Sequence, residues 1–156
     1  MPLIDLPLAE LRKYPGRNPR PADFEAYWGA AIKELDATDP KPELRPNPTV
    51  NARGIECFDL WFTGVGDARI YAKYLRPKNS AEKSPAVLQF HGYSGHSADW
   101  VDKLGWPAAG FCFASMDVRG QGGKSEDNSQ VKGTTSVSRK RPALEEKPTR
   151  RGMPAR

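Results

Sequence analysis

The chain has little of what marks several common protein classes. It has two cysteines in 156 residues, Cys57 and Cys112, each in an apolar stretch, so we expect two free, buried thiols and no disulfide framework. No apolar run approaches the roughly 20 residues of a membrane-spanning helix, so no membrane partner is expected. The N-terminus lacks a basic segment before an apolar one, which predicts a cytoplasmic protein without a secretory signal.

An excess of charge of one sign is also missing from most of the chain. Basic residues exceed acidic ones by five overall, but residues 136–156 alone contain seven basic and two acidic residues. The first 135 residues are therefore neutral, with basic and acidic side chains interleaved. A nucleic-acid-binding surface needs clustered Lys and Arg to displace counterions, so we expect no specific nucleic acid partner.

Residues 136–156 form a basic tail that differs in composition from residues 1–135. The tail contains few large apolar side chains, and such a segment cannot bury enough surface to offset its loss of conformational entropy. We therefore predict a folded domain over residues 1–135 and a disordered tail. As an alternative function, the chain would be a non-catalytic interaction protein that acts through this tail, with residues 138–142 at its centre.

The N-terminal part of the chain predicts one helix between two irregular segments. Residues 1–20 are rich in Pro and Arg and are expected to be extended. From Pro21 to a point before Asp39 the apolar residues recur at helical spacing on one face. These residues are Phe24, Tyr27, Trp28, Ala31, Ile32 and Leu35. Residues 40–48 contain four prolines and are expected to form a linker in coil conformation.

The middle of the chain predicts an antiparallel hairpin followed by a parallel strand–helix–strand unit. Residues 55–62 and 69–75 alternate and are joined by a turn at residues 64–67. Residues 86–90 and 111–116 are nearly continuous apolar runs, typical of strands covered on both faces.

Between these two runs, residues 98–109 have helical spacing. Pro107 is expected to kink or end this helix and Gly110 to cap it. Such a crossover is right-handed and joins parallel strands, so the fold class is α/β.

A glycine-containing loop follows each of the two apolar strands. Because the carboxyl ends of parallel strands meet at one rim of a sheet, the loops at residues 91–95 and 117–122 should lie together. Gly92 and Gly95 would permit a tight turn in which a backbone N–H points into a cleft, as a developing oxyanion requires. The alternative is that both glycines merely connect a strand to a helix.

From Pro21 to about Gly133 the chain resembles the N-terminal part of the acetyl xylan esterase / cephalosporin C deacetylase family, which is carbohydrate esterase family seven. The matching segments are Pro21–Phe24, Tyr27–Trp28, Phe90–Tyr93, Trp100 with Asp102 and Leu104, Met116–Gly123, and Ser125. Within them, Arg119-Gly120-Gln121 matches the first signature triplet of the family. The resemblance implies a truncated α/β-hydrolase fold, made of the N-terminal helix, the hairpin and one strand–helix–strand unit.

The resemblance also implies an activity and roles for several residues. Members of the family are cytoplasmic serine carboxylesterases that deacetylate small acetylated carbohydrates and related acetyl esters, and no cofactor is expected. The backbone N–H of Tyr93 would help to form the oxyanion hole, and its side chain would touch substrate. Residues with a bracing role in the active-site loops would be His91, Gly92, Arg119, Gly120 and Gln121.

The catalytic residues of the family are missing from the sequence. Neither the second signature, G-x-S-Q-G with the nucleophilic serine, nor the later His-Glu signature occurs, and the triad acid would also lie downstream. Without a nucleophile there is no covalent route, so we predict little or no turnover. The strand 86–90 would also lack the neighbour that leads to the nucleophile. Its apolar edge predicts poor solubility and self-association or aggregation.

The chain could in principle supply its own nucleophile. Residues 92–96 approach G-x-S-x-G but end in His96, so an arrangement of Ser94 or Ser97 with His91 or His96 is an alternative. We favour the interpretation that these hydroxyls cap the helix that begins near residue 98.

The remaining candidates for chemistry are few. Asp117 follows its strand as a triad acid would, but an aspartate that hydrogen-bonds loop amides is the favoured interpretation. Two isolated histidines and no Cys/His spacing predict no metal site.

Overall fold

The computed structural model describes residues 5–129, and the chain divides into two units after Ala37. Each unit is described by itself. The tail of residues 136–156, with its predicted disorder and alternative function, lies outside the described residues.

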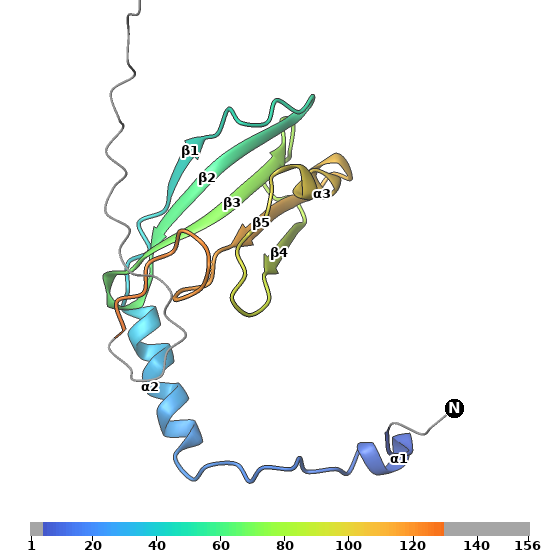
Figure 1. Cartoon of the computed structure of the whole chain (residues 1–156), viewed down its shortest axis with the longest axis vertical. Helices are drawn as coiled ribbons and strands as arrows, with labels where there is room; N and C mark the ends of the chain where they lie inside the picture. The colour runs from blue at the N-terminus through green and yellow to red at the C-terminus, as the bar shows by residue number, and fades with distance from the viewer. Residues whose placement is uncertain (1–4, 130–156) are drawn as a thin grey trace, which may run out of the picture. The chain divides into compact units, whose positions relative to one another are not determined.

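The first unit contains two helices, α1 (Leu8–Leu11) and α2 (Phe24–Asp36) (Figure 1). The predicted helix is confirmed as α2, whose apolar stripe is exposed within this unit. The prediction that residues 1–20 are wholly irregular is wrong, because α1 forms one helical turn after Pro7. Proline suits that position because its fixed φ fits the start of a helix and it needs no N–H partner there.

The second unit is built on one mixed sheet of five strands in the order β1-β2-β3-β5-β4 (Figure 1). The strands are β1 (Glu43–Pro46), β2 (Ile55–Thr63), β3 (Arg69–Pro77), β4 (Ala86–Phe90) and β5 (Cys112–Met116). All neighbours are antiparallel except β4 and β5, which are parallel. The hairpin and the parallel unit are therefore confirmed.

Strand β1 lies inside the segment predicted to be a coil linker, so that prediction is wrong. The strand is short and pairs with β2 through Leu44 opposite Leu60 and Arg45 opposite Asp59. A proline at Pro46 does not prevent this, because β1 is an edge strand and needs ladder hydrogen bonds on one side only.

The connection from β4 to β5 is not the continuous helix that the spacing predicts. It forms a 3₁₀ turn, η2 (Val101–Lys103), and a single turn of α-helix, α3 (Gly105–Ala108). Pro107 lacks an N–H and cannot extend the helix from residue 101. As predicted, Gly110 ends the segment, and its φ of 92° is a value that glycine adopts without strain. A second 3₁₀ turn, η1 (Val65–Asp67), joins β2 to β3.

The hydrophobic core lies on one face of the sheet. Its centre consists of Cys57, Leu75, Trp100 and Phe113, with Val87 and Leu104 packed against it. Both cysteines are free, Cys57 buried and Cys112 half-buried. None of the helices in the described part of the chain could cross a membrane.

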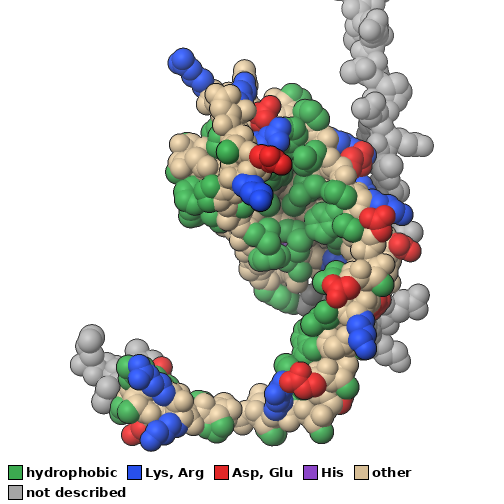
Figure 2. Space-filling model, turned by 180° about the vertical axis from the view of Figure 1, so that it is seen from behind, with side chains coloured by type: hydrophobic (Ala, Val, Ile, Leu, Met, Phe, Trp, Pro, Cys, Tyr) green, Lys and Arg blue, Asp and Glu red, His purple; other side chains and the backbone are tan. Residues whose placement is uncertain are grey.

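The opposite face of the sheet is apolar and open, and Figure 2 shows apolar side chains gathered there. One cross-strand row consists of Leu44, Leu60, Ala72, Met116 and Phe90. The prediction that both faces of residues 86–90 are covered is wrong, since Leu88 is 59% and Phe90 55% exposed.

Candidate oxyanion-loop site

The two glycine loops leave the carboxyl ends of β4 and β5 on the same rim of the sheet (Figure 1). Three hydrogen bonds join them. The N–H of Ser94 donates to the side-chain oxygen of Gln121, the N–H of Val118 to Nε2 of His91 at 2.9 Å, and the N–H of Gly122 to the carbonyl of Gly95 at 3.0 Å. The expectation that these loops lie together is confirmed, and the bonds fix one loop against the other.

His91 is held in one tautomer by its two contacts. Because Nε2 accepts from the Val118 N–H, the proton is on Nδ1, which lies 2.7 Å from the carbonyl oxygen of Gly92 and donates to it. The imidazole therefore uses both nitrogens within the rim. It braces the two loops and has no free nitrogen to act as a base.

Gln121 and Arg119 extend this bracing. Gln121 reaches back to the N–H of Ser94, a residue with φ of 57°. The guanidinium of Arg119 donates to the carbonyl of Val65, 3.0 Å away in the β2–β3 turn. The signature triplet thus links the β5 loop to the β4 loop on one side and to the hairpin on the other.

Close packing explains three of the four glycines in the two loops, residues 91–95 and 117–122. A Cβ on Gly95 would lie 2.9 Å from the carbonyl of Gly92, and one on Gly122 would lie 2.8 Å from the carbonyl of Ser94. Gly120 has a φ of 66° and would meet the carboxylate of Asp127. Gly92 has open space around its Cβ position and no positive φ, so the expectation that it permits the turn sterically is wrong.

Asp117 lies at the centre of the rim and is buried. Its carboxylate accepts the N–H of Ser97 at 2.6 Å, just after the first loop, and the N–H of Lys124 at 2.8 Å, just after the second. The hydroxyl of Ser125 donates to the Asp117 carbonyl at 2.6 Å and accepts the N–H of Tyr71 at 2.9 Å. The interpretation of Asp117 as an aspartate that binds loop amides is confirmed.

Lys73 is a member of this cluster that the sequence did not reveal. Its ammonium group donates to the hydroxyl of Ser97 at 2.8 Å, and both side chains are buried. Burial lowers the pKa of Lys73 below that of an ordinary lysine, and the nearby Asp117 carboxylate opposes this shift. The signal that could have found it is a lysine inside an apolar strand, on the face that carries Tyr71 and Leu75.

The serine and histidine residues do not form a nucleophile–base pair in the described part of the chain. The Ser97 hydroxyl is occupied by Lys73, His91 binds the Val118 N–H, and Nδ1 of His96 accepts the N–H of Ala98. The favoured interpretation of the hydroxyls as helix caps is also wrong, because neither η2 nor α3 has a side-chain cap.

Tyr93 lies at the exposed tip of the β4 loop, and 78% of its surface is accessible. The next two N–H groups along the chain are engaged, that of Ser94 by Gln121 and that of Gly95 by the Gly92 carbonyl at 3.0 Å. Within residues 5–129 the Tyr93 N–H makes no hydrogen bond. A fixed loop therefore presents a free backbone donor at the rim. The same residues contain no cluster of His, Cys, Asp and Glu suited to a metal ion.

Comparisons with known proteins agree with one another. The sequence model of a family described as acetyl xylan esterase (AXE1) matches residues 1–139, a range that begins before Pro21 and ends after Gly133. Acetyl xylan esterase 1 from Thermoanaerobacterium sp. JW/SL YS485 is 51% identical, with a TM-score of 0.73 over 83% of this chain. Acetyl xylan esterase from Paenibacillus sp. R4 is 25% identical, with a TM-score of 0.70 over 81% of this chain. The chain spans 40% of the length of each solved structure. No curated protein matched.

Proposed function

Since the chain belongs to the acetyl xylan esterase family, we propose that its sheet and rim loops form one wall of an acetyl-ester pocket in an α/β-hydrolase fold. The reaction served by this pocket is the deacetylation of small acetylated sugars and related acetyl esters through an acyl-enzyme. The wall supplies the group that stabilises the oxyanion, and the nucleophile comes from elsewhere in a complete family site.

The free N–H of Tyr93 is the observation that supports this proposal. It is flanked by Ser94, whose N–H is fixed by Gln121, and the loop is tied again through His91 to Val118. A donor held in this way does not have to reorganise when negative charge develops on a carbonyl oxygen, which is why such donors contribute strongly to acyl transfer. The exposed ring of Tyr93 would contact the substrate beside it.

The bracing residues act through Tyr93 and do not react. His91, Gln121 and Arg119 hold the loop through the contacts described above. Gly120 allows the β5 loop its left-handed turn. Gly92, which neighbouring atoms do not crowd, leaves the peptide next to Tyr93 open to a substrate.

We also propose that the 156-residue polypeptide does not turn over esters by itself. No serine hydroxyl of residues 5–129 is hydrogen-bonded to an imidazole, and Asp117 uses its carboxylate on two loop amides. A nucleophile without a base is unreactive at neutral pH.

A chimera tests the role of Tyr93. Residues 1–129 of this chain would replace the matching segment of the Thermoanaerobacterium enzyme, which would supply the rest of the site. Tyr93→Pro removes the N–H donor, whereas Tyr93→Ala keeps the donor and removes the ring. For the proline variant we expect kcat for an acetyl ester to fall by roughly 10²- to 10³-fold, as for other oxyanion donors.

The alanine variant is the matched control and should retain kcat while KM rises, because only the substrate contact is lost. A melting curve for each variant shows whether the chimera still folds. A folded proline variant with unchanged kcat would remove Tyr93 from the oxyanion hole.

A further inference from the structure

A row of polar side chains crosses the core face of the sheet, one step below the rim. Its members lie opposite one another on β2, β3, β5 and β4, and they are Asp59, Lys73, Ser115 and Gln89. The row lies between the apolar core around Leu75 and the loops that leave β4 and β5. Burying a charged group is unfavourable unless its contacts compensate. Lys73, with 8% of its surface exposed, is therefore the member of the row that needs an explanation.

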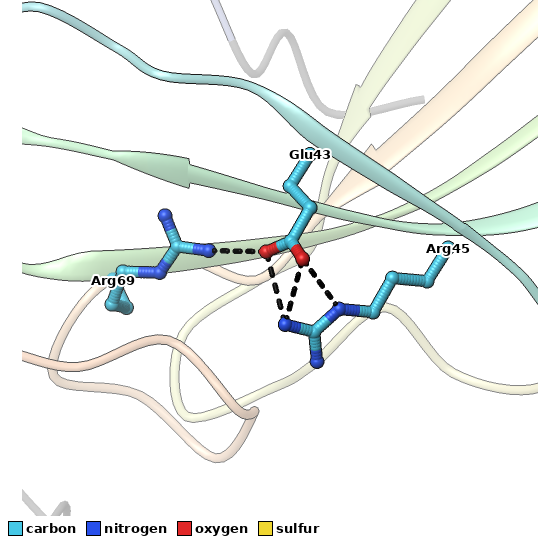
Figure 3. A network of polar contacts seen from close by, with 3 residues as sticks. All are labelled: Glu43, Arg45 and Arg69. Carbon is cyan, nitrogen blue, oxygen red and sulfur yellow. Dashed lines mark hydrogen bonds and ion pairs between the residues drawn. The ribbon is translucent and has the colours of Figure 1, made fainter.

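Other charged side chains of the sheet are matched by opposite charges near its surface. Glu43 of β1 forms ion pairs with Arg45 at 2.9 Å and with Arg69 of β3 at 3.1 Å (Figure 3). Lys73 forms no ion pair within residues 5–129. Its ammonium group donates to the neutral hydroxyl of Ser97 at 2.8 Å. Ion pairing therefore does not account for a lysine at this position, and its contact with Ser97 is the interaction to explain.

Ser97 follows the loop that carries Tyr93 and anchors the far end of that loop. Its hydroxyl accepts from Lys73 on β3, and its N–H donates to Asp117 after β5 at 2.6 Å. The near end of the loop is held by His91, through its bond to the other rim loop. The free N–H of Tyr93 lies between these two anchors along the chain, so its position depends on both.

A lysine beside a serine is also the arrangement of a catalytic serine–lysine pair. The geometry opposes that role here. Ser97 is 1% exposed, so an ester does not reach its hydroxyl. The ammonium group of Lys73 is covered by the rings of Tyr71 and Trp100, whose centroids are 5.6 Å and 5.5 Å away. The pair is therefore a link between β3 and the loop, and it does not react.

We propose that Lys73 is a positioning residue of the oxyanion loop, which fixes the Tyr93 N–H through the hydrogen bond to Ser97. The inference rests on the function proposed above for Tyr93. An oxyanion donor lowers the barrier because it is already in place when the charge develops, so freedom at one end of the loop reduces its effect. Because Lys73 is buried below the loop and does not contact the substrate, its loss should lower kcat and leave KM unchanged.

Hydrogen exchange in the 156-residue chain tests the link without any assumption about activity. The N–H groups of Ser94 and Gly95 are hydrogen-bonded within the rim and report on the loop. Lys73→Met keeps an unbranched side chain and removes the donor. Both amides should then exchange roughly tenfold faster, as expected for the loss of a hydrogen bond from a charged group.

Lys103→Met is the matched control for this measurement. Lys103 is 7% exposed, and its ammonium group also donates to a neutral oxygen, that of the Gln89 side chain at 2.9 Å. The bond reaches a strand and not the loop. Lys103→Met should therefore leave the exchange of Ser94 and Gly95 unchanged, even where it lowers the stability of the chain.

Steady-state kinetics on the chimera described above measures the consequence for catalysis. Lys73→Met should lower kcat for an acetyl ester by roughly tenfold at unchanged KM. Ser97→Ala removes the acceptor of the same bond and should have the same effect. Because both substitutions break one contact, the double variant should be no slower than either single variant. Lys103→Met should leave kcat and KM unchanged.

Four results would overturn the proposal. They are equal loop exchange in Lys73→Met and Lys103→Met, additive effects of Lys73→Met and Ser97→Ala on kcat, a change in KM in place of kcat, and labelling of Ser97 by a fluorophosphonate. If Tyr93→Pro leaves kcat unchanged, the proposed function fails, while the exchange rates still decide whether Lys73 holds the loop. Melting curves identify variants that do not fold, and Ser97→Ala remains informative if Lys73→Met is one of them.

Discussion

The ammonium group of Lys73 donates a hydrogen bond to the hydroxyl oxygen of Ser97 over 2.8 Å, deep in the rim of the sheet. The backbone N–H of Ser97 in turn donates to Asp117 at 2.6 Å, so a charge on β3 is connected to both rim loops. The ring of Trp100 covers this charge at 5.5 Å from its centroid. Lys73, buried below the rim, is thus connected through Ser97 and Asp117 to the loops at the rim of the sheet.

The pH dependence of stability should reveal this lysine. Burial lowers the pKa of Lys73 in the folded chain below the ordinary value of 10.5. At a pH between the pKa of Lys73 in the folded chain and its pKa in the unfolded chain, the unfolded chain binds the proton and the folded chain does not. The free energy of unfolding therefore increases with pH. Lys73→Met removes this contribution.

Urea unfolding from about pH 7 to about pH 10 should therefore show the stability of wild type increasing relative to Lys73→Met. Lys83→Met, at an exposed position, is the matched control and should track wild type. A difference between wild type and Lys73→Met that stays flat or falls with pH would contradict the account.

Gly123→Ala should be strongly destabilising. A Cβ at this position would overlap the carboxylate of Asp117, which is itself fixed by Ser97 and Lys124 and has nowhere to move. Overpacking of this kind costs about 1–3 kcal/mol. Gly92→Ala lies in the same rim with open space around it and should change stability by less than about 0.5 kcal/mol. Chemical denaturation measures both, and equal effects would show that the rim is not packed as described.

His91→Ala should loosen the β5 loop. It leaves the half-buried N–H of Val118 without its acceptor, at a cost of about 1–2 kcal/mol. Hydrogen–deuterium exchange should become faster at Val118 and at Ser94 across the rim. Among residues 5–129 the His96 imidazole bonds to Ala98 alone, so His96→Ala should not alter exchange at Val118. The same exchange rates in both variants would exclude a bracing role for His91.

Strands β2, β3 and β4 were predictable because the burial of their side chains imposes an apolar or alternating sequence. The apolar run of β4 and the alternation of β2 and β3 gave both their positions and their pairing. Strand β1 could not be found, because its four residues have no periodicity and it is held in the sheet by β2. The sequence predicted one helix after β4 because the spacing of apolar residues gives no information on backbone dihedral angles. Ala98 has a φ of 51°, a left-handed conformation in which a helix cannot start.

The loops of the site were predictable from the sequence, but the buried residues beneath them, Lys73 and Ser97, were not. The glycine loops and the amide-binding role of Asp117 followed from their position after apolar strands. Lys73 shares its face of β3 with Tyr71 and Leu75, but a lysine in an alternating strand usually faces solvent, so the residue type argued against the burial that its spacing indicated. The use of Ser97 as its partner depends on a contact between residues 24 positions apart, and no local pattern encodes such a contact.

The central claim is that this chain supplies the oxyanion side of an acyl-transfer pocket and brings no attacking group to it. The most direct measurement is the intact mass of the purified 156-residue chain after incubation with a fluorophosphonate, which reacts with activated serines. The account predicts an unchanged mass and no p-nitrophenyl acetate cleavage above that of buffer. Stoichiometric labelling of a serine, with loss of ester cleavage in the same proportion, would contradict it.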